Sequence, residues 1–208
     1  MARLTANAKT RARERLLQAA ATRFAADGFE AASVNTISAE AGFAKGTVYN
    51  YFSSKDELFG EVIRTACERA VRIWSQAPSS GSLRARLEAL AAADVQVLRE
   101  QEAFMQVLVR EAMSFRPQTY SLILAHLAPF LDAVSGALEQ AAAEGRLRDD
   151  LPPEQLALMF LGFLVLLYIQ HWGSGSVWPP LDEVPALATT LFLDGAGRSS
   201  RDEREIQP

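Results

Sequence analysis

Cysteine is nearly absent from this chain, and histidine is almost as scarce. Cys67 is the single cysteine among 208 residues, so no disulfide can form within the chain. This fits a reducing compartment and the cytoplasmic location that we expect. We interpret Cys67 as a small buried residue in preference to a redox sensor. His126 and His171 lie on different predicted helices, and no His/Cys cluster has metal-site spacing, so we expect no metal.

Signatures of catalysis are also missing from the sequence. It holds no Gly-rich phosphate loop and no nucleophile elbow. The acidic residues are scattered over predicted helix surfaces, where Glu144, Asp149 and Asp150 have the character of solvated groups. We therefore expect no enzymatic activity and no cofactor.

No apolar run is as long as a membrane span. The longest run, residues 156–169, has fourteen residues, whereas a helix that crosses a bilayer needs about 20. The N-terminus is basic but lacks the apolar stretch of a signal peptide. We expect no membrane association and interpret the run as a helix that is buried on nearly all sides.

Charge is distributed unevenly along the chain, whose net charge is −4. Residues 1–55 hold eight basic and four acidic side chains, whereas residues 56–208 hold thirteen basic and twenty-one acidic ones. A basic N-terminal module joined to an acidic body fits a protein with one end that faces nucleic acid. The alternative is that the two parts differ in charge by chance.

The most informative stretch is residues 33–55, SVNTISAEAGFAKGTVYNYFSSK, which has the pattern of two short helices and a tight turn. Apolar spacing predicts the first helix over 34–41, with Ser33 as its N-cap. Gly42 ends this helix, because glycine adopts the left-handed conformation without strain. A second helix is predicted over 45–52, with Val48 and Phe52 turned inward.

The outward face of the second helix presents Lys45, Thr47, Tyr49 and Asn50. These side chains are cationic, hydroxylic, phenolic and amide groups, which bind phosphate oxygens and base edges. Two short helices, a Gly turn and a polar outward face are typical of a DNA-binding helix-turn-helix.

The string AGFAKGTVYNYFSSKDELF, residues 41–59, resembles the signature of the tetracycline-repressor (TetR) family of bacterial transcription regulators. The resemblance extends back to GFEAASVNTIS at 28–38 and covers about the first 60 residues. It departs from the family at Ala44, where serine is frequent. The resemblance implies a DNA-binding repressor that binds a palindromic operator as a dimer and is released by a small, mostly apolar ligand.

This resemblance and the outward face together give the predicted DNA contacts. We expect Lys45, Thr47 and Asn50 to approach the major groove, and Tyr49, Tyr51 and Lys55 mainly to hold phosphates. The complete predicted DNA-binding set is Ser33, Asn35, Lys45, Gly46, Thr47, Tyr49, Asn50, Tyr51 and Lys55. A basic cluster in the preceding helix is either a solvated helix end or a further phosphate-binding group; it consists of Lys9, Arg11, Arg13 and Arg15.

The periodicity of the whole chain predicts an all-α fold of about nine helices without strands. We expect a three-helix DNA-binding domain over 1–55, a connecting helix over 56–77, a ligand-binding and dimerisation domain over 78–194, and a disordered tail over 195–208. Within the C-terminal domain the predicted helices are 83–98, 104–112, 118–144, 154–172 and 182–193, with Pro129 inside the third of them.

Aromatic residues in the C-terminal domain suggest a pocket, because small-molecule sites are mostly apolar with a few placed polar groups. Ordinary core packing is the alternative for most of them. The predicted ligand-binding residues are Phe104, Leu108, Tyr120, Ile123, His126, Phe163, Leu167 and Tyr168, with Arg110 and His171 as further polar candidates.

The helix over 154–172 is apolar around most of its circumference, so one chain cannot cover it completely. We expect a homodimer in which this helix and the helix over 182–193 pair with their copies about a two-fold axis, as in the TetR family. Two alternatives to a ligand-gated regulator are a DNA-binding protein gated by a protein partner and a helical small-molecule module with an incidental helix-turn-helix. The match over 41–59 argues against the latter.

Overall fold

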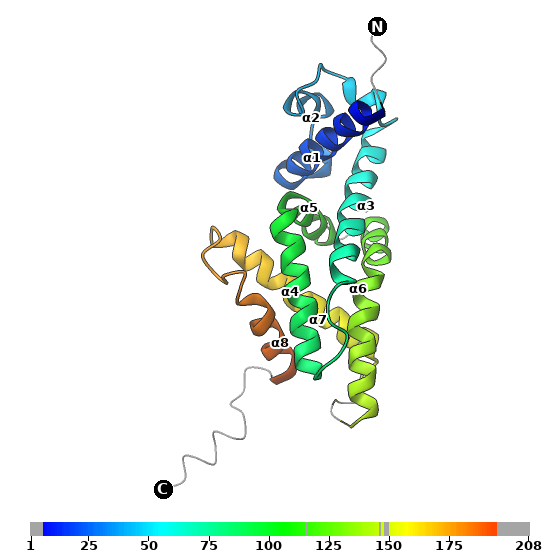
Figure 1. The fold of residues 1–208 in the computed structure, drawn as a ribbon. Helices are drawn as coiled ribbons and strands as arrows, with labels where there is room; N and C mark the ends of the chain where they lie inside the picture. Colours follow the sequence, from blue (N-terminus) through cyan, green and yellow to red (C-terminus); the bar gives the residue numbers. More distant parts are fainter. Residues whose placement is uncertain (1–5, 115, 146, 148–149, 195–208) are drawn as a thin grey trace. The chain divides into compact units, whose positions relative to one another are not determined.

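The computed structural model describes residues 6–114, 116–145, 147 and 150–194, and all regular structure in these residues is helical. The predicted all-α fold with an N-terminal helix-turn-helix is therefore confirmed. The elements are α1 (Ala6–Ala31), α2 (Val34–Glu40), η1 (Thr47–Asn50), α3 (Lys55–Trp74), α4 (Leu83–Glu100), α5 (Glu102–Ala112), α6 (Pro117–Ala143), α7 (Pro153–Gly173) and α8 (Val184–Asp194) (Figure 1). The tail predicted over 195–208 lies outside the described residues.

Two compact units make up the chain, and each is described by itself. The first unit comprises Met1–Ala70 and Val97–Leu127, and the second comprises Val71–Gln96 and Ala128–Pro208. This division differs from the expected boundary near residue 78, because α5 packs against α1 and so joins the DNA-side unit. Helices α3, α4 and α6 contribute to both units, and α6 divides beside Pro129, whose missing N–H removes one helical hydrogen bond.

The core of the first unit is built on the apolar stripe of α1, in which Leu16 and Phe24 are fully buried. Phe29 follows the break in α1 and packs on Phe24 at 5.9 Å between ring centroids. Phe59 of α3 completes the cluster, at 5.3 Å from Phe24 and 4.9 Å from Phe29. Three aromatic side chains thus fix α1 and α3 beneath the two short helices.

The start of α3 is capped by Ser54 and Glu57. Ser54 Oγ accepts a hydrogen bond from the Glu57 backbone N–H at 3.0 Å, and the Glu57 carboxylate accepts one from the Ser53 N–H at 2.5 Å. This reciprocal arrangement satisfies two donors that the helix leaves unpaired. The hydrogen bonds from Ser53 lower the pKa of Glu57, because they favour its charged form.

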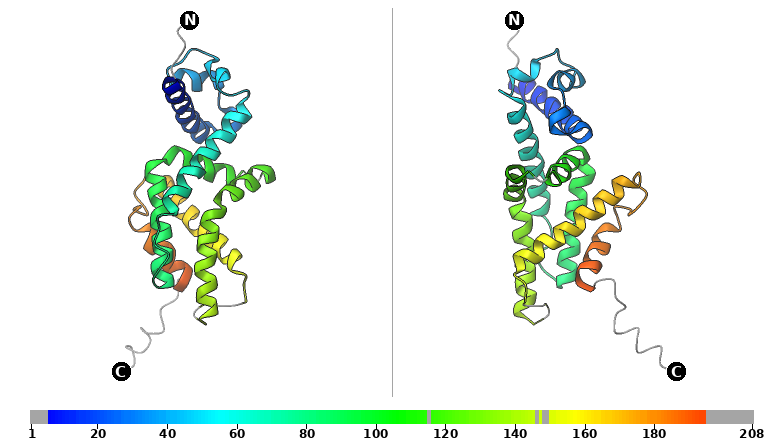
Figure 2. Two further views of the ribbon diagram at one scale, coloured as in Figure 1. Left: turned by 45° about the vertical axis from the view of Figure 1, so that its right-hand side comes forward. Right: turned by 180° about the vertical axis from the view of Figure 1, so that it is seen from behind.

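In the second unit, α7 and α8 lie side by side and are joined by a loop (Figure 2). Phe160 of α7 is fully buried and contacts Phe192 of α8 edge to face at 5.3 Å. Trp74, at the end of α3, packs on Phe130 of α6 at 4.9 Å. His171 is buried, and its Nδ1 lies 2.9 Å from the Pro179 carbonyl oxygen, so this histidine organises the loop after α7.

Helices α6 and α7 are each long and apolar enough to cross a membrane, by length and composition alone. The fourteen-residue run of the sequence is extended by its flanks to the 21 residues of α7. One face of α7 is buried, and the opposite face leaves Met159 (55% exposed), Leu166 (52%) and Ile169 (37%) uncovered. The expectation that one chain covers only part of this helix is confirmed.

Candidate nucleic-acid interface

The first helix of the motif, α2, is placed by a cap and a turn that its sequence dictates. Ser33 is extended and its side chain accepts a hydrogen bond from the Thr36 N–H at 3.5 Å, as predicted for an N-cap. After α2, Gly42 adopts a left-handed conformation with φ +75°. This backbone conformation favours glycine, and an added Cβ would also have to displace the Arg15 guanidinium.

The recognition element is shorter and tighter than the α-helix predicted over 45–52. It is a single 3-10 turn, Thr47–Asn50, that begins after Gly46 in the left-handed conformation. Hydrogen bonds of the i→i+3 type connect the Tyr49 N–H to the Gly46 carbonyl at 3.0 Å and the Tyr51 N–H to the Val48 carbonyl at 2.9 Å. The physical reason is Gly46, whose left-handed backbone does not continue a regular α-helix.

Buried side chains hold this turn against α2. Val48 and Phe52 are 0% and 2% exposed, as predicted for the inward face. The Val48 N–H also donates to Ser38 Oγ at 3.4 Å, and Ser38 itself is fully buried. The turn is therefore anchored from beneath, and its outer side is left for a partner.

Most of the predicted DNA-binding side chains gather on that outer side. Tyr49 is 56% exposed, although an aromatic side chain of a small domain is usually buried. The other exposed members are Ser33, Asn35, Lys45 and Asn50, while Gly46, Thr47, Tyr51 and Lys55 are partly exposed. Hydroxyl, amide, phenol and ammonium groups thus lie together on α2 and η1, which is the donor set that reads phosphates and base edges.

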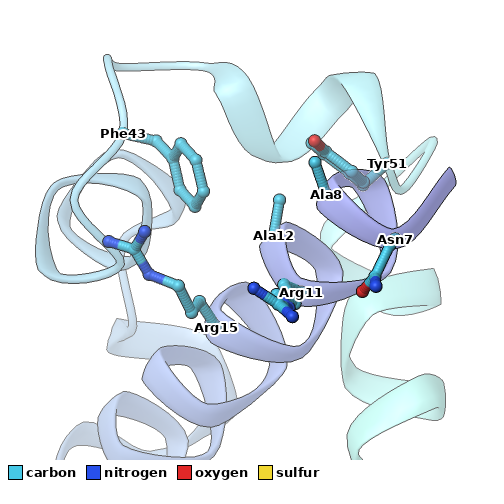
Figure 3. Close-up of a pocket in the computed structure, with 7 residues that line it drawn as sticks. All are labelled: Asn7, Ala8, Arg11, Ala12, Arg15, Phe43 and Tyr51. Atoms are coloured by element: carbon cyan, nitrogen blue, oxygen red, sulfur yellow. The ribbon is translucent and has the colours of Figure 1, made fainter. Parts of the chain in front are cut away.

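A groove beside this surface separates the N-terminal part of α1 from the turn and η1. Its volume is about 390 Å³, and its lining residues are Asn7, Ala8, Arg11, Ala12, Arg15, Phe43 and Tyr51. Figure 3 shows Phe43 and Tyr51 above the α1 residues, with Arg11 beside Asn7. Arg11 is exposed, so its cationic group is accessible in the groove that Tyr51 also lines.

Two arginines of the basic cluster in α1, Arg13 and Arg15, have partners within the fold. Arg13 forms an ion pair with Glu61 of α3. Hydrogen bonds from Arg64 and from Arg13 lower the pKa of the Glu61 carboxyl to about 2. Arg15 donates to the Ala41 carbonyl at 2.5 Å and lies over the Phe43 ring at 4.9 Å (Figure 3). Both arginines therefore fasten α1 to its neighbours.

Lys55 also has an intramolecular role. Its ammonium donates to the Glu30 carbonyl at 3.0 Å and lies 4.8 Å from the centroid of the Phe29 ring. Sequence spacing could not reveal these partners, because they depend on contacts between residues 25 or more positions apart. The remaining cations of the surface are Lys45 of the turn and Lys9 and Arg11 of α1, all of which are exposed.

The predicted ligand-binding residues fall into both units. Phe104, Leu108, Tyr120, Ile123 and His126 belong to the first unit, and Phe163, Leu167 and Tyr168 belong to the second. Tyr120, near the start of α6, is 44% exposed. The ligand-binding set remains a prediction.

A buried carboxylate in the second unit was missed by sequence reasoning. Asp94 of α4 is 2% exposed and accepts hydrogen bonds from Trp74 Nε1 at 3.1 Å and from the Tyr168 hydroxyl at 2.7 Å. Burial raises the pKa of Asp94 to about 6, although both hydrogen bonds act in the opposite direction. The predicted pocket residue Tyr168 thus joins α7 to α4, and Trp74 joins the end of α3 to the same carboxyl.

Arg110, a candidate polar group for the ligand, is placed elsewhere. Its guanidinium donates to the carbonyls of Ala25 and Ala26 at 2.8 and 3.0 Å, at the end of the straight part of α1. Arg110 thus contacts the DNA-side helix α1, and its role as a polar group for a ligand remains a prediction.

Comparison with known proteins gives a consistent result. Residues 16–62 match the family model described as bacterial regulatory proteins, tetR family. The repressor KstR2 of Rhodococcus jostii (strain RHA1) is 28% identical over 192 residues, which cover 90% of this chain and 92% of the repressor.

Two solved structures are similar in fold over nearly the whole chain. The regulator FadR of Bacillus subtilis, in complex with stearoyl-CoA, has a TM-score of 0.75 at 17% identity and covers 88% of this chain and 99% of its own. The fatty acid degradation regulator FadR of Bacillus halodurans has a TM-score of 0.76 at 21% identity, covering 90% and 97%.

Proposed function

We propose that this chain, which belongs to the TetR family of bacterial regulatory proteins, is a cytoplasmic repressor. It binds a palindromic operator as a dimer, and it leaves the operator when a small apolar ligand binds. The observation that carries the proposal is the recognition surface on α2 and η1. Val48 and Phe52 are buried beneath it, while Lys45, Tyr49 and Asn50 are exposed on its outer side. A turn anchored in this way inserts polar groups into a major groove without rearrangement.

The uncovered face of α7 supports the dimer. Met159, Gly162, Leu166, Ile169 and Gly173 follow one another at spacings of three and four, so they form one stripe along the helix. A Cβ added at Gly162 or Gly173 would meet open space, so a second helix can approach closely there. A second copy of α7 covers this stripe, and the two-fold axis places two recognition turns for two half-sites about 34–36 Å apart, one turn of DNA.

The operator is the first thing to establish. The full chain would be incubated with a random pool of duplex DNA, and bound sequences would be selected at a fixed salt concentration near 0.15 M. We expect a palindrome with two half-sites. Recovery of DNA without a common sequence would contradict the proposal, because a regulator of this kind must prefer its operator to other DNA.

For the ligand we propose a long-chain acyl-CoA or a molecule of similar chemistry, with a long apolar chain and a polar head. Support comes from the apolar character of the C-terminal helices and from the similar fold of FadR, whose structure contains stearoyl-CoA. A ligand that binds only the folded state raises the melting temperature. We expect stearoyl-CoA to raise it and free coenzyme A to have little effect.

Gating by a protein partner is the second candidate. The body presents exposed apolar side chains in addition to those of α7, namely Val177 and Trp178 in the loop before α8. If neither acyl-CoA nor other apolar compounds change the melting temperature or release the operator, a partner protein becomes the better explanation.

A further inference from the structure

The loop that joins α7 and α8 in the second unit presents two adjacent apolar side chains to solvent (Figure 2). Val177 is 74% exposed and Trp178 is 52% exposed. A tryptophan removes roughly 150–250 Å² from water when it is buried, and it is frequent among the residues that contribute most to protein interfaces. The pair is therefore a candidate contact for a partner.

Internal hydrogen bonds fix the backbone of this loop. Ser174 Oγ accepts a hydrogen bond from the Trp178 N–H at 2.8 Å, and its hydroxyl donates to the Trp178 carbonyl at 2.8 Å. The next residue, Pro179, is buried, and its carbonyl oxygen lies 2.9 Å from Nδ1 of the buried His171. Ser176 adopts a left-handed conformation with φ 67°, which is unfavourable for a residue with a side chain. A side chain held out by such a fixed loop loses little freedom when it binds a partner.

The uncovered stripe of α7, in the same unit, is too small to form a stable dimer by itself. Its large side chains are those of Met159 (55% exposed), Leu166 (52%) and Ile169 (37%). Covering them removes at most roughly 300 Å² from water on each copy. A specific interface buries about 800 Å² per partner. A dimer through α7 therefore needs further apolar surface, and the loop begins where the stripe ends, after Gly173.

Small and large residues alternate along the stripe in an order that selects an antiparallel pairing. Met159 and Gly173 lie seven positions on either side of Leu166, while Gly162 and Ile169 lie four positions before it and three after it. A copy related by a two-fold axis at Leu166 and running in the opposite direction places each glycine opposite a large side chain, so the two surfaces interdigitate. A parallel copy would place glycine opposite glycine and leave gaps.

Antiparallel pairing brings opposite ends of the two helices together. Leu158 (40% exposed) and Met159 are the exposed apolar side chains near the start of α7, and Val177 and Trp178 follow its end. Within one chain the two pairs cannot cover each other, because the fifteen positions from Leu158 to Gly173 span about 22 Å of helix. In an antiparallel dimer the loop of each copy follows the helix end that lies next to the start of the other copy's α7.

From this geometry we infer that Trp178 packs against Leu158 and Met159 of the partner subunit, twice in each dimer, and that this contact anchors the dimer. The inference rests on the proposed dimer and adds to it the register of the two α7 helices and the residue that contributes most to their association.

Cysteine cross-linking tests the register. A protein with Met159→Cys and a protein with Gly173→Cys are mixed, allowed to exchange subunits and oxidised mildly. We expect a disulfide-linked pair only in the mixture, because two copies of either position are about 21 Å apart on antiparallel helices. A Cβ at Gly173 meets open space, and the native Cys67 is 1% exposed, so neither interferes. A linked pair in Met159→Cys alone would indicate a parallel pairing and would overturn the inference.

Sedimentation equilibrium of single and double variants tests the anchor. We expect Trp178→Ala to raise the dissociation constant of the dimer at least about thirtyfold, as for a residue at the centre of an interface. Leu158→Ala should raise it less, and the double variant should raise it by less than the product of the two effects, because both remove the same contact. Leu122→Ala, at a leucine of α6 with the same exposed fraction of 40%, is the matched control and should keep the wild-type constant.

An unchanged dissociation constant in Trp178→Ala would overturn the inference and leave the loop available to a partner protein. Effects of Trp178→Ala and Leu158→Ala that multiply fully would overturn it as well. Should Trp178→Ala fail to fold, the cross-linking experiment still decides the register, since it leaves Trp178 in place. A monomeric wild-type protein would contradict the proposed dimer itself, whereas a wild-type dimer that fails these tests contradicts only the contact of Trp178.

Discussion

Side chains of one chemical type have different roles within a few residues of each other. Arg13 and Arg15 are bonded to Glu61 and to the Ala41 carbonyl, whereas Arg11 is exposed and lines the groove next to the recognition turn (Figure 3). Arg13 and Arg15 of α1 therefore stabilise the fold, whereas Arg11 of the same helix presents its cation to solvent. This contrast determines which substitutions affect DNA binding directly.

Arg11→Ala is expected to weaken binding to operator and to unrelated DNA by the same factor. Loss of one phosphate contact lowers the magnitude of the slope of log K against log salt by about 0.9. A fluorescence anisotropy titration at four or more salt concentrations measures this slope. Lys55→Ala is the comparison, and because Lys55 is bonded to Glu30 it should change the slope less. Equal slopes for Arg11→Ala and the wild type would remove Arg11 from the interface.

Asn50→Ala should instead affect specificity. An amide that reads a base edge contributes roughly 1–3 kcal/mol of discrimination, so operator affinity falls by about one to two orders of magnitude while binding to unrelated DNA is retained. Competition titrations with both DNAs provide the measurement. An equal loss of affinity for operator and for unrelated DNA would show that Asn50 binds a phosphate and not a base edge.

Asp94 makes folding stability depend on pH. Because burial raises its pKa from 3.8 to about 6, the folded state binds the proton more tightly than the unfolded state. The stabilisation is fully present below pH 3.8 and is lost as the pH rises through 6, with a total change of about 3 kcal/mol.

Asp94→Asn should remove this pH dependence and raise the free energy of unfolding at pH 7.5, because no buried charge remains. Urea denaturation between pH 4.5 and 7.5 tests this, with Asp132→Asn on the exposed face of α6 as the control. A wild-type protein whose stability does not fall across this range would contradict the account, as would an Asp94→Asn variant that keeps the wild-type slope.

At the scale of elements, the helix-turn-helix depends on glycines at its two left-handed positions. Gly42 and Gly46, at φ +75° and +78°, turn the chain between α2 and η1. Any other residue there adopts a strained backbone, at a cost of roughly 1–2 kcal/mol. At Gly42 an added Cβ also displaces the Arg15 guanidinium from the end of α2.

A substitution in helix α7 tests the proposed dimer. Leu166→Arg places a charge in the middle of the uncovered stripe, where the proposed two-fold contact would bury it without a partner. Because Leu166 is 52% exposed in one chain, the monomer should fold normally. Light scattering should show a dimer for the wild type and a monomer for the variant, which also loses the tight binding to a paired operator.

A matched control for this change is Leu122→Arg, at an exposed leucine of α6. It should remain dimeric. A wild-type protein that is a stable monomer at micromolar concentration would defeat the assembly that we propose.

Helix positions and local caps could be predicted because they depend on neighbours in sequence. The cap at Ser33, the stop at Gly42 and the buried positions of Val48 and Phe52 follow from periodicity and from the chemistry of single residues. The 3-10 geometry of η1 was not predicted, since the same apolar spacing of four also fits an α-helix.

Contacts between residues that are far apart in the sequence could not be predicted from local patterns. Arg110 lies 84 and 85 positions from its two acceptors, and no local pattern distinguishes it from a solvated arginine. Asp94 likewise occurs among alanines and valines of α4, where only the fold reveals that Trp74 and Tyr168 meet it. Tyr120 fits the apolar stripe of α6 by spacing but remains exposed.

In the whole molecule, ligand binding and operator binding must each lower the affinity for the other. A hundredfold loss of operator affinity on binding of stearoyl-CoA requires about 2.7 kcal/mol of coupling, which is within the usual range of roughly 1–3 kcal/mol. By linkage, saturating operator must weaken the binding of stearoyl-CoA by the same factor.

Calorimetric titration of the acyl-CoA into free protein and into the protein–operator complex measures this factor. Equal affinities in the two titrations would show that the compound binds without regulating the protein. An operator of scrambled sequence, which the protein does not occupy, is the control for ligand binding to DNA.

Tryptophan and cysteine are both scarce in this chain, and each of them reports on a different unit. All three tryptophans, Trp74, Trp172 and Trp178, belong to the second unit, so selectively excited tryptophan fluorescence reports on that unit. The single thiol, Cys67, belongs to the first unit and is 1% exposed, and burial raises its pKa to about 12. Alkylation of Cys67 therefore requires an opening of the first unit, and its rate measures the free energy of that opening. Unlabelled wild-type protein thus allows the unfolding of each unit to be timed separately, with and without operator.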